Sequence, residues 1–407
     1  MAVGEGFNGT LVPVAGITIG VGCAGIKVVG RRDLVIFELS PGSTIGAVFT
    51  QNAFCAAPVQ ICKEHLGAGQ ATRFLVVNTG NANAGTGQRG LDDARETCTR
   101  LAAHKSVDPE QVLPFSTGVI GEYLPMTALA NGLPNALATL ASDNWQDAAQ
   151  GILTTDTREK GGSRQFEFEN ETITVTGIAK GSGMIKPNMA TMLAFICTDA
   201  PIDQALLQSI TEAATTASFN RITVDSDTST NDACVVMATG KAQVKRVTSA
   251  EDPLYGYLLK TIKELMLSLA QQIIRDGEGA SKFIEVRVEG ALSADEALAV
   301  AFSVADSPLF KTAMSASDAN WGRILMAVGK SKIDQLDVNC IDVYLGDVQI
   351  VAGGERAQGY TEAQGAAIVA QEEIIVRILL QRGVVNESVW TSDLSHEYVR
   401  INAEYRS

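Results

Sequence analysis

Histidine is scarce in this chain of 407 residues, which has only His65, His104 and His396. Its seven cysteines are scattered, and neither a C-x-x-C pair nor a zinc-ligand spacing occurs. This excludes the common zinc motifs and histidine-based catalysis along most of the chain, so a nucleophilic enzyme with this sequence needs another base. We expect the thiols to be reduced, with several of them in the core.

Long apolar runs and basic clusters are also missing. No stretch approaches the roughly 18 apolar residues of a membrane span, and the N-terminus lacks a basic segment followed by an apolar block. The formal net charge is −14, and the one basic cluster is Arg31 with Arg32, which argues against nucleic acid as a partner. We therefore expect a cytoplasmic protein without membrane or nucleic-acid partners, whose site can still bind small charged molecules.

The 38 glycines do not complete a phosphate-binding motif. "GVGCAG" at residues 20–25 matches G-x-G-x-x-G, but a strand pattern follows it and the expected acidic residue is missing. "GNANAGTG" at residues 80–87 has Thr86 where a P-loop requires lysine, and "GSGMIK" at residues 181–186 has Lys186 in place of the third glycine. We interpret the first as a turn between strands and the second as a tight turn or a substrate-facing loop.

Strand and helix patterns mix along the chain without a regular β-α alternation. Short strands broken by glycines fill the first ninety residues, and apolar spacing predicts helices at residues 92–104 and 257–275. Alternation predicts hairpins that turn at residues 169–171 and at Gly346 and Asp347. The mixture favours an α+β fold, with layered sheets covered by helices, over a doubly wound parallel sheet.

The long helix pattern stops at "DGEG", residues 276–279, where glycine is an expected terminator. We place a domain boundary there, with a main domain at residues 1–280 that carries the site. A smaller C-terminal α/β domain is expected at residues 281–407. The tail "HEYVRINAEYRS" stays patterned to its last residue, so we expect it to be docked on the protein.

Thr191 stands where a glycine-rich loop enters an apolar strand, in "AKGSGMIKPNMATMLAFICTDA" at residues 179–200. An N-terminal threonine can use its own α-amino group, with a pKa of ~7.7–8.0, as the base for its hydroxyl. Cleavage between Ala190 and Thr191 would create that terminus, and Pro187 and the glycines would let the preceding loop bend. Taken alone, the pattern fits better an ordinary strand that begins with threonine.

The same segment resembles the autoprocessing region of the ornithine acetyltransferases, also called glutamate N-acetyltransferases. Similar motifs run from residue 78 to the end, and "VAGITIGVGCAGIK" extends the likeness to the start; the others are "NTGNANAGTG", "STGVIGEYLPM", "TTDTREK", "SFNRITVDSDTSTND", "DGEGASKFIEV", "ANWGRIL" and "YVRINAEYRS". The resemblance implies a layered αββα sandwich with an N-terminal threonine nucleophile. It also implies an α chain of residues 1–190 and a β chain of residues 191–407, assembled as α2β2.

The family pattern assigns roles to individual residues of this sequence. Thr191 is the nucleophile, Ala190 is the other side of the cut, and Thr117 and Gly118 in "STGVIGE" match the oxyanion hole. The positions that match substrate-binding residues are Thr154, Lys180, Thr191, Glu278, Asn402 and Ser407.

Several of these positions also have an ordinary structural interpretation. Lys180 resembles the family's substrate-binding lysine, and Glu278 the carboxylate that meets the ammonium group of ornithine. For both, a solvated loop charge is the ordinary alternative. The neighbours Thr155 and Thr157 leave the choice of Thr154 open.

The implied reaction belongs to arginine biosynthesis and follows a ping-pong course. Thr191 takes the acetyl group from N2-acetylornithine and then gives it to glutamate. The resemblance implies no metal and no bound cofactor, with acetyl-CoA as a second donor in some members. Two alternatives stay open: a related self-cleaving amidase or aminopeptidase that uses water in place of glutamate, and an uncleaved, inactive binding protein.

Overall fold

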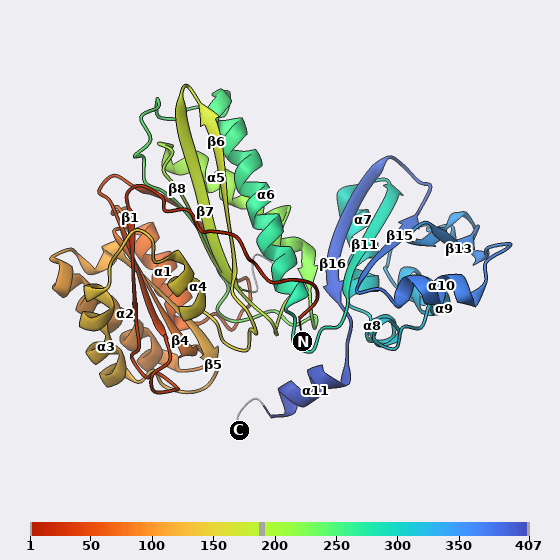
Figure 1. The fold of residues 1–407 in the computed structure, drawn as a ribbon, viewed down its shortest axis with the longest axis horizontal. Coiled ribbons are helices and arrows are strands. Elements are labelled where there is room, and N and C mark those ends of the chain that lie inside the picture. The colour runs from red at the N-terminus through yellow and green to blue at the C-terminus, as the bar shows by residue number, and fades with distance from the viewer. Residues whose placement is uncertain (1, 187–191, 405–407) are drawn as a thin grey trace.

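A computed structural model describes residues 2–186 and 192–404 of the chain (Figure 1). Its strands form three sheets. The first has four strands, in the order β1 (Ile17–Gly22), β2 (Leu34–Leu39), β4 (Phe74–Asn81) and β5 (Val112–Val119). The second has five, in the order β3 (Thr44–Phe49), β10 (Ala233–Ala238), β8 (Leu193–Thr198), β7 (Glu171–Lys180) and β6 (Lys160–Phe168).

These two sheets pack face to face, and helices cover their outer faces (Figure 1). The helices beside the first sheet are α1 (Ala57–Gly67), α2 (Gly87–Lys105) and α3 (Met126–Ala138). Helix α4 (Trp145–Gly151) contributes Trp145 to the core between the sheets. The helices beside the second sheet are α5 (Gln204–Thr216) and α6 (Pro253–Arg275). The four layers confirm the predicted αββα sandwich.

Strand β8 has the sequence LAFICT and is apolar at every position except Thr198. Successive side chains of a strand point to opposite faces of its sheet. Leu193, Phe195 and Cys197 lie in the core between the sheets. Ala194 and Ile196 lie in the core beneath α5 and α6. Both faces of the strand are therefore buried, as the sequence predicts.

The third sheet belongs mainly to the C-terminal part of the chain. Its order is β14 (Glu355–Arg356), β13 (Val348–Ala352), β12 (Asp342–Leu345), β15 (Glu373–Leu379), β11 (Phe283–Ala291), β16 (Val385–Ser392) and β9 (Ile222–Thr223). Its helices are α7 (Ala294–Ala305), α8 (Pro308–Ser315), α9 (Trp321–Gly329) and α10 (Glu362–Val369). Because β9 precedes residue 280, this sheet draws on both predicted domains, and the boundary itself stays a prediction.

The two hairpin turns lie where the sequence predicts them. The β6–β7 hairpin turns at Glu169 and Asn170, both with positive φ, and Gly346 begins the β12–β13 turn with φ +54°. The tail forms helix α11 (His396–Ala403), whose first turn is capped by the Ser395 hydroxyl. Within the described residues, no helix combines the length and the apolar character of a membrane span.

Candidate active site

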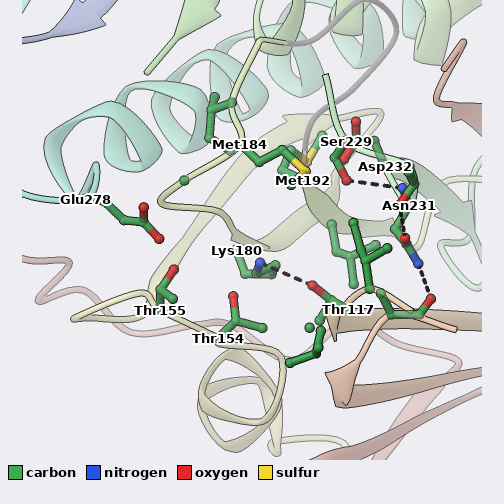
Figure 2. A pocket seen from close by; sticks show the side chains of 18 of the residues that line it. Thr117, Thr154, Thr155, Lys180, Met184, Met192, Ser229, Asn231, Asp232 and Glu278 are labelled. Carbon is green, nitrogen blue, oxygen red and sulfur yellow. Dashed lines mark hydrogen bonds between the residues drawn. The ribbon is translucent and has the colours of Figure 1, made fainter. Parts of the chain in front are cut away.

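The predicted site residues that the structure describes line one pocket of ≈ 240 Å³ (Figure 2). They are Thr117, Gly118, Thr154, Lys180, Glu278 and Asn402. They come from β5, β7, α11 and two loops, so the fold gathers residues that are far apart in the sequence. Ala190, Thr191 and Ser407 lie outside the described residues, and their roles stay predictions. Met192, which follows Thr191, lines the same pocket.

Gly118 lies near the end of β5, where it pairs with Gly80 of the neighbouring strand β4. Its φ of +136° lies in a region that favours glycine. A Cβ atom at this position would lie 2.2 Å from the carbonyl carbon of Gly80. Glycine is therefore required both by the local conformation and by the close approach of the two strands. Thr117, the preceding residue, points its hydroxyl toward Lys180 (Figure 2).

Lys180 is the last residue of β7 and is only 9% exposed. Its Nζ donates a hydrogen bond to Thr117 Oγ1 at 3.3 Å and lies 4.0 Å from Asp156 Oδ2. Burial lowers the pKa of this ammonium group, and the charge of Asp156 partly opposes that effect. Lys180 is therefore a poorly solvated donor beside the pocket, suited to binding an anionic group.

A buried ionic cluster of Asp156, Lys160 and Asp276 lies behind Lys180. Lys160 Nζ donates to Asp156 Oδ1 at 2.7 Å and to Asp276 Oδ2 at 2.6 Å. Asp156 also accepts from the backbone N–H groups of Thr154 (2.9 Å) and Gly181 (2.7 Å). Burial raises the pKa of Asp156, but the neighbouring ammonium groups outweigh it, so the pKa lies below its ordinary value. The ionic cluster thereby fixes two loops at the pocket.

The three neighbouring threonines, Thr154, Thr155 and Thr157, have different surroundings in the structure. Thr154 and Thr155 both line the pocket (Figure 2). Thr157 instead donates its hydroxyl and its backbone N–H to Asp276. Thr154 is thus joined by Thr155 as a candidate contact for a ligand, whereas Thr157 is hydrogen-bonded to Asp276 of the ionic cluster.

Glu278 lines another part of the pocket and is 7% exposed. Its Oε2 accepts a hydrogen bond from Asn402 Nδ2 at 2.8 Å. A Cβ atom at Gly183 would lie 2.3 Å from the same carboxylate oxygen, so glycine there makes room for Glu278. The pocket thus presents a cation, Lys180, and an anion, Glu278, on separate walls (Figure 2), an arrangement that matches a ligand with both a carboxylate and an ammonium group.

Asp225 is a supporting residue that the sequence did not single out. Its carboxylate accepts from the backbone N–H groups of Met184 (2.6 Å) and Ile185 (2.8 Å) and from the Tyr398 hydroxyl (3.1 Å). Burial, followed by the charge of Asp225, raises the pKa of Tyr398. One carboxylate therefore connects the segment before the predicted cut to α11, the helix that carries Asn402.

Asp225 lies in "SFNRITVDSDTSTND", and Asp156 in "TTDTREK". Both segments carry the family resemblance, yet the sequence pattern distinguishes neither aspartate from its neighbours. The first segment contains three aspartates, and spacing alone gives no way to choose the one that accepts two backbone N–H groups. The pocket residues Asn231 and Asp232 come from the same segment and were also missed.

A model of the ArgJ family matches residues 18–407 of the chain. The chain belongs to the ArgJ family. The arginine biosynthesis bifunctional protein ArgJ of Pseudomonas fluorescens (strain Pf0-1) is 54% identical over 407 residues, covering 100% of both chains. The protein of the same name from Pseudomonas syringae pv. tomato (strain ATCC BAA-871 / DC3000) is 53% identical over 408 residues, again covering 100% of both chains.

A solved ArgJ structure is also similar. The crystal structure of the arginine biosynthesis bifunctional protein from Bacillus halodurans has a TM-score of 0.50 and 42% identity, covering 52% of this chain and 99% of that chain. The solved ArgJ chain is therefore about half as long as this one. Together with the family match, these likenesses confirm the family that the sequence motifs indicate.

Proposed function

We propose that this chain is an acetyltransferase of arginine biosynthesis that moves the acetyl group of N2-acetylornithine to glutamate. The observation that carries the proposal is the pairing of Lys180 and Glu278 on separate walls of one pocket. Lys180 would bind the α-carboxylate of ornithine, and Glu278 its side-chain ammonium group. Membership of the ArgJ family supports the same reaction.

The proposed enzyme first cleaves itself. Thr191 Oγ attacks the Ala190 carbonyl carbon, the Ala190–Thr191 amide bond breaks, and water hydrolyses the resulting ester. The products are the α chain, residues 1–190, and the β chain, residues 191–407, which begins with a free threonine amino group. The half-length chain of the Bacillus halodurans relative supports this maturation.

In turnover, the α-amino group of Thr191 takes the proton of Oγ as Oγ attacks the acetyl carbonyl. The acetyl C–N bond breaks, and ornithine leaves with that proton. The amino group of glutamate then attacks the acetyl ester, and its proton returns to Oγ. Backbone N–H groups at Thr117 and Gly118 would stabilise the negative oxygen of both tetrahedral intermediates.

This reaction scheme requires no metal and no bound cofactor. Acetyl-CoA would serve as a second acetyl donor to the same threonine, and the word "bifunctional" in the names of the relatives supports that use. We also propose that the α and β chains stay associated as α2β2 in the cytoplasm. The described fold supports association, because both chains would contribute strands to the five-stranded sheet.

Denaturing gel electrophoresis with N-terminal sequencing tests the maturation. We expect two bands, one of which begins at Thr191, in place of a single chain of 43.0 kDa. Thr191→Ala should leave the chain intact and inactive, whereas Thr191→Ser keeps a hydroxyl nucleophile and should retain cleavage. A single intact band from the unmodified protein would favour the uncleaved binding protein. Two bands with normal turnover from Thr191→Ala would refute the assignment.

A release assay separates the transferase from a related amidase. The transferase should release ornithine continuously only when glutamate is present, because the acetyl group otherwise stays on Thr191. An amidase would release acetate at the same rate with and without glutamate, since water is then the acceptor. That result would overturn the proposed reaction even if the chain is cleaved.

A further inference from the structure

A second cavity, of ≈ 190 Å³, adjoins the pocket that contains Lys180 and Glu278. The residues common to both cavities are Gly118, Val119, Thr154 and Thr155. The wall that belongs to the second cavity includes Lys27, Arg31 and the α11 residue Ile401. In a chain with a net charge of −14, two basic residues therefore meet beside the candidate active site.

Arg31 is held in place by neutral groups. Its guanidinium Nη2 donates to the carbonyl oxygens of Leu153 at 2.6 Å and Thr154 at 3.4 Å. In the part of the chain that the structure describes, no carboxylate lies within ion-pair distance of it. The neighbouring Arg32, in contrast, pairs with Asp147 at 3.1 Å. The charge of Arg31 is thus fixed in position but not neutralised, which is the state that binding of an anion requires.

Lys27 adds a second cation to the same cavity. A Cβ atom at Gly80 would lie 2.9 Å from Lys27 Cβ, so the glycine lets the lysine approach the cavity wall. Gly80 has a φ of +105°, where other residues are strained. The backbone at this point therefore supports the placement of Lys27.

The two substrates of the proposed reaction differ in the charge of their side chains. Ornithine ends in an ammonium group, for which Glu278 is a suitable partner. Glutamate ends in a carboxylate, which Glu278 would repel at short range. Both must present their reacting groups to the same threonine, because a ping-pong reaction uses one nucleophile. The carboxylate of glutamate therefore needs a cationic wall away from Glu278.

We propose that the cavity at Arg31 and Lys27 binds the side-chain carboxylate of the acceptor glutamate. This inference rests on the proposed acetyl transfer and adds a subsite to it. Ile401 supplies an apolar contact for the methylene groups of the acceptor. The phosphates of acetyl-CoA share the anionic chemistry and are the other source of such a ligand, which the experiment distinguishes.

The test compares Arg31→Met with Arg32→Met, a matched control from the next position. With N2-acetylornithine as donor, glutamate and glutamine are compared as acceptors, since they differ only in the charge and hydrogen bonding of the side-chain end. We expect Arg31→Met to lower kcat/KM for glutamate about tenfold, the loss typical of one charged hydrogen bond. The value for glutamine should change less than the value for glutamate, and Arg32→Met should change neither.

Three results would overturn the subsite. Equal losses for glutamate and glutamine would show that Arg31 merely supports the Thr154 loop. If the unmodified enzyme used glutamine as well as glutamate, a cationic wall would not be needed. A rise in KM for acetyl-CoA, with the kinetics of glutamate unchanged, would assign the cavity to phosphate.

The first half-reaction distinguishes a failure of the glutamate subsite from a failure of the proposed acetyl transfer. The first half-reaction, release of one ornithine per enzyme from N2-acetylornithine, does not involve the acceptor. It should proceed normally in Arg31→Met if only the subsite is affected. Its absence from the unmodified enzyme would refute the acetyl transfer itself, whatever Arg31 does.

Discussion

Two fully buried lysines show two ways of keeping a charge in the interior. Lys160, behind the pocket, lies between the carboxylates of Asp156 and Asp276 and is 0% exposed. Lys311, in α8 of the C-terminal part, is 3% exposed. It donates instead to two uncharged oxygens, Thr391 Oγ1 and the carbonyl of Ser392. The first lysine is part of a charged network, whereas the second has hydrogen bonds but, among the residues that the structure describes, no ion-pair partner.

The difference has a consequence for protonation. Burial lowers the pKa of Lys311 to about 8, and the more distant carboxylates of Asp393, Asp306 and Asp225 oppose that shift only in part. In the ionic cluster, contact with ammonium groups keeps the pKa of Asp156 below its ordinary value. Direct pairing therefore fixes charges near the pocket, whereas neutral partners leave Lys311 able to lose its proton near pH 8.

The largest effect is expected from Lys160→Met. The change leaves Asp156 and Asp276 buried without their shared counter-charge, which costs ~3–5 kcal/mol of unfolding free energy for a broken buried pair. Urea unfolding at pH 7 measures the loss. Lys105→Met is the matched control, because its partly exposed pair with Glu38 should contribute less than ~1 kcal/mol. Similar losses from both variants would contradict the distinction.

Lys180→Met should affect binding more than stability. Its ammonium group contacts Thr117 but is 4.0 Å from Asp156, so it is not the main partner of the ionic cluster. We expect kcat/KM for N2-acetylornithine to fall by roughly 10- to 100-fold through loss of a charged hydrogen bond to the substrate carboxylate. Unfolding free energy should change by ~1 kcal/mol or less. Steady-state kinetics and urea unfolding on the same cleaved sample check both parts.

The smallest effect at neutral pH is expected from Lys311→Met, which should change stability by ~1 kcal/mol or less. The difference should appear at higher pH. Unfolded Lys311 keeps its proton up to its ordinary pKa of ~10.4, whereas the folded state releases it at about 8. Between these values the unfolded state binds more protons, so this lysine makes stability rise with pH. The unmodified protein should therefore gain stability relative to Lys311→Met from pH 8 to pH 10. A constant difference would show that Lys311 keeps its charge.

Features determined by neighbouring residues were predicted well from the sequence. The turn at Glu169 and Asn170 and the turn at Gly346 follow from alternation and turn residues alone. Helix α2 was predicted to begin at residue 92 but begins at Gly87. Its first turn packs Gly90 against Asn83 and Thr86, so no apolar spacing marks it.

The ionic cluster could not be predicted, because its parts lack a local pattern. In the sequence, Asp276 is part of the helix terminator "DGEG", and the other two members of the cluster, Asp156 and Lys160, lie more than 100 positions earlier. Lys180, Glu278 and Asn402 were named through the family resemblance, and only the fold explains why they share a pocket. Exposed charges and pocket charges look alike in a sequence, since burial is a property of the assembled chain.

The order of strands in the five-stranded sheet bears on what self-cleavage would leave behind. β3, β6 and β7 precede the Ala190–Thr191 bond, and β8 and β10 follow it. The β3–β10 and β7–β8 ladders therefore cross between the two product chains. Neither product could leave by simple dilution, because departure would open a sheet in the centre of the molecule. The cut would change the number of chains without creating a separable pair, and release of one from the other would amount to unfolding.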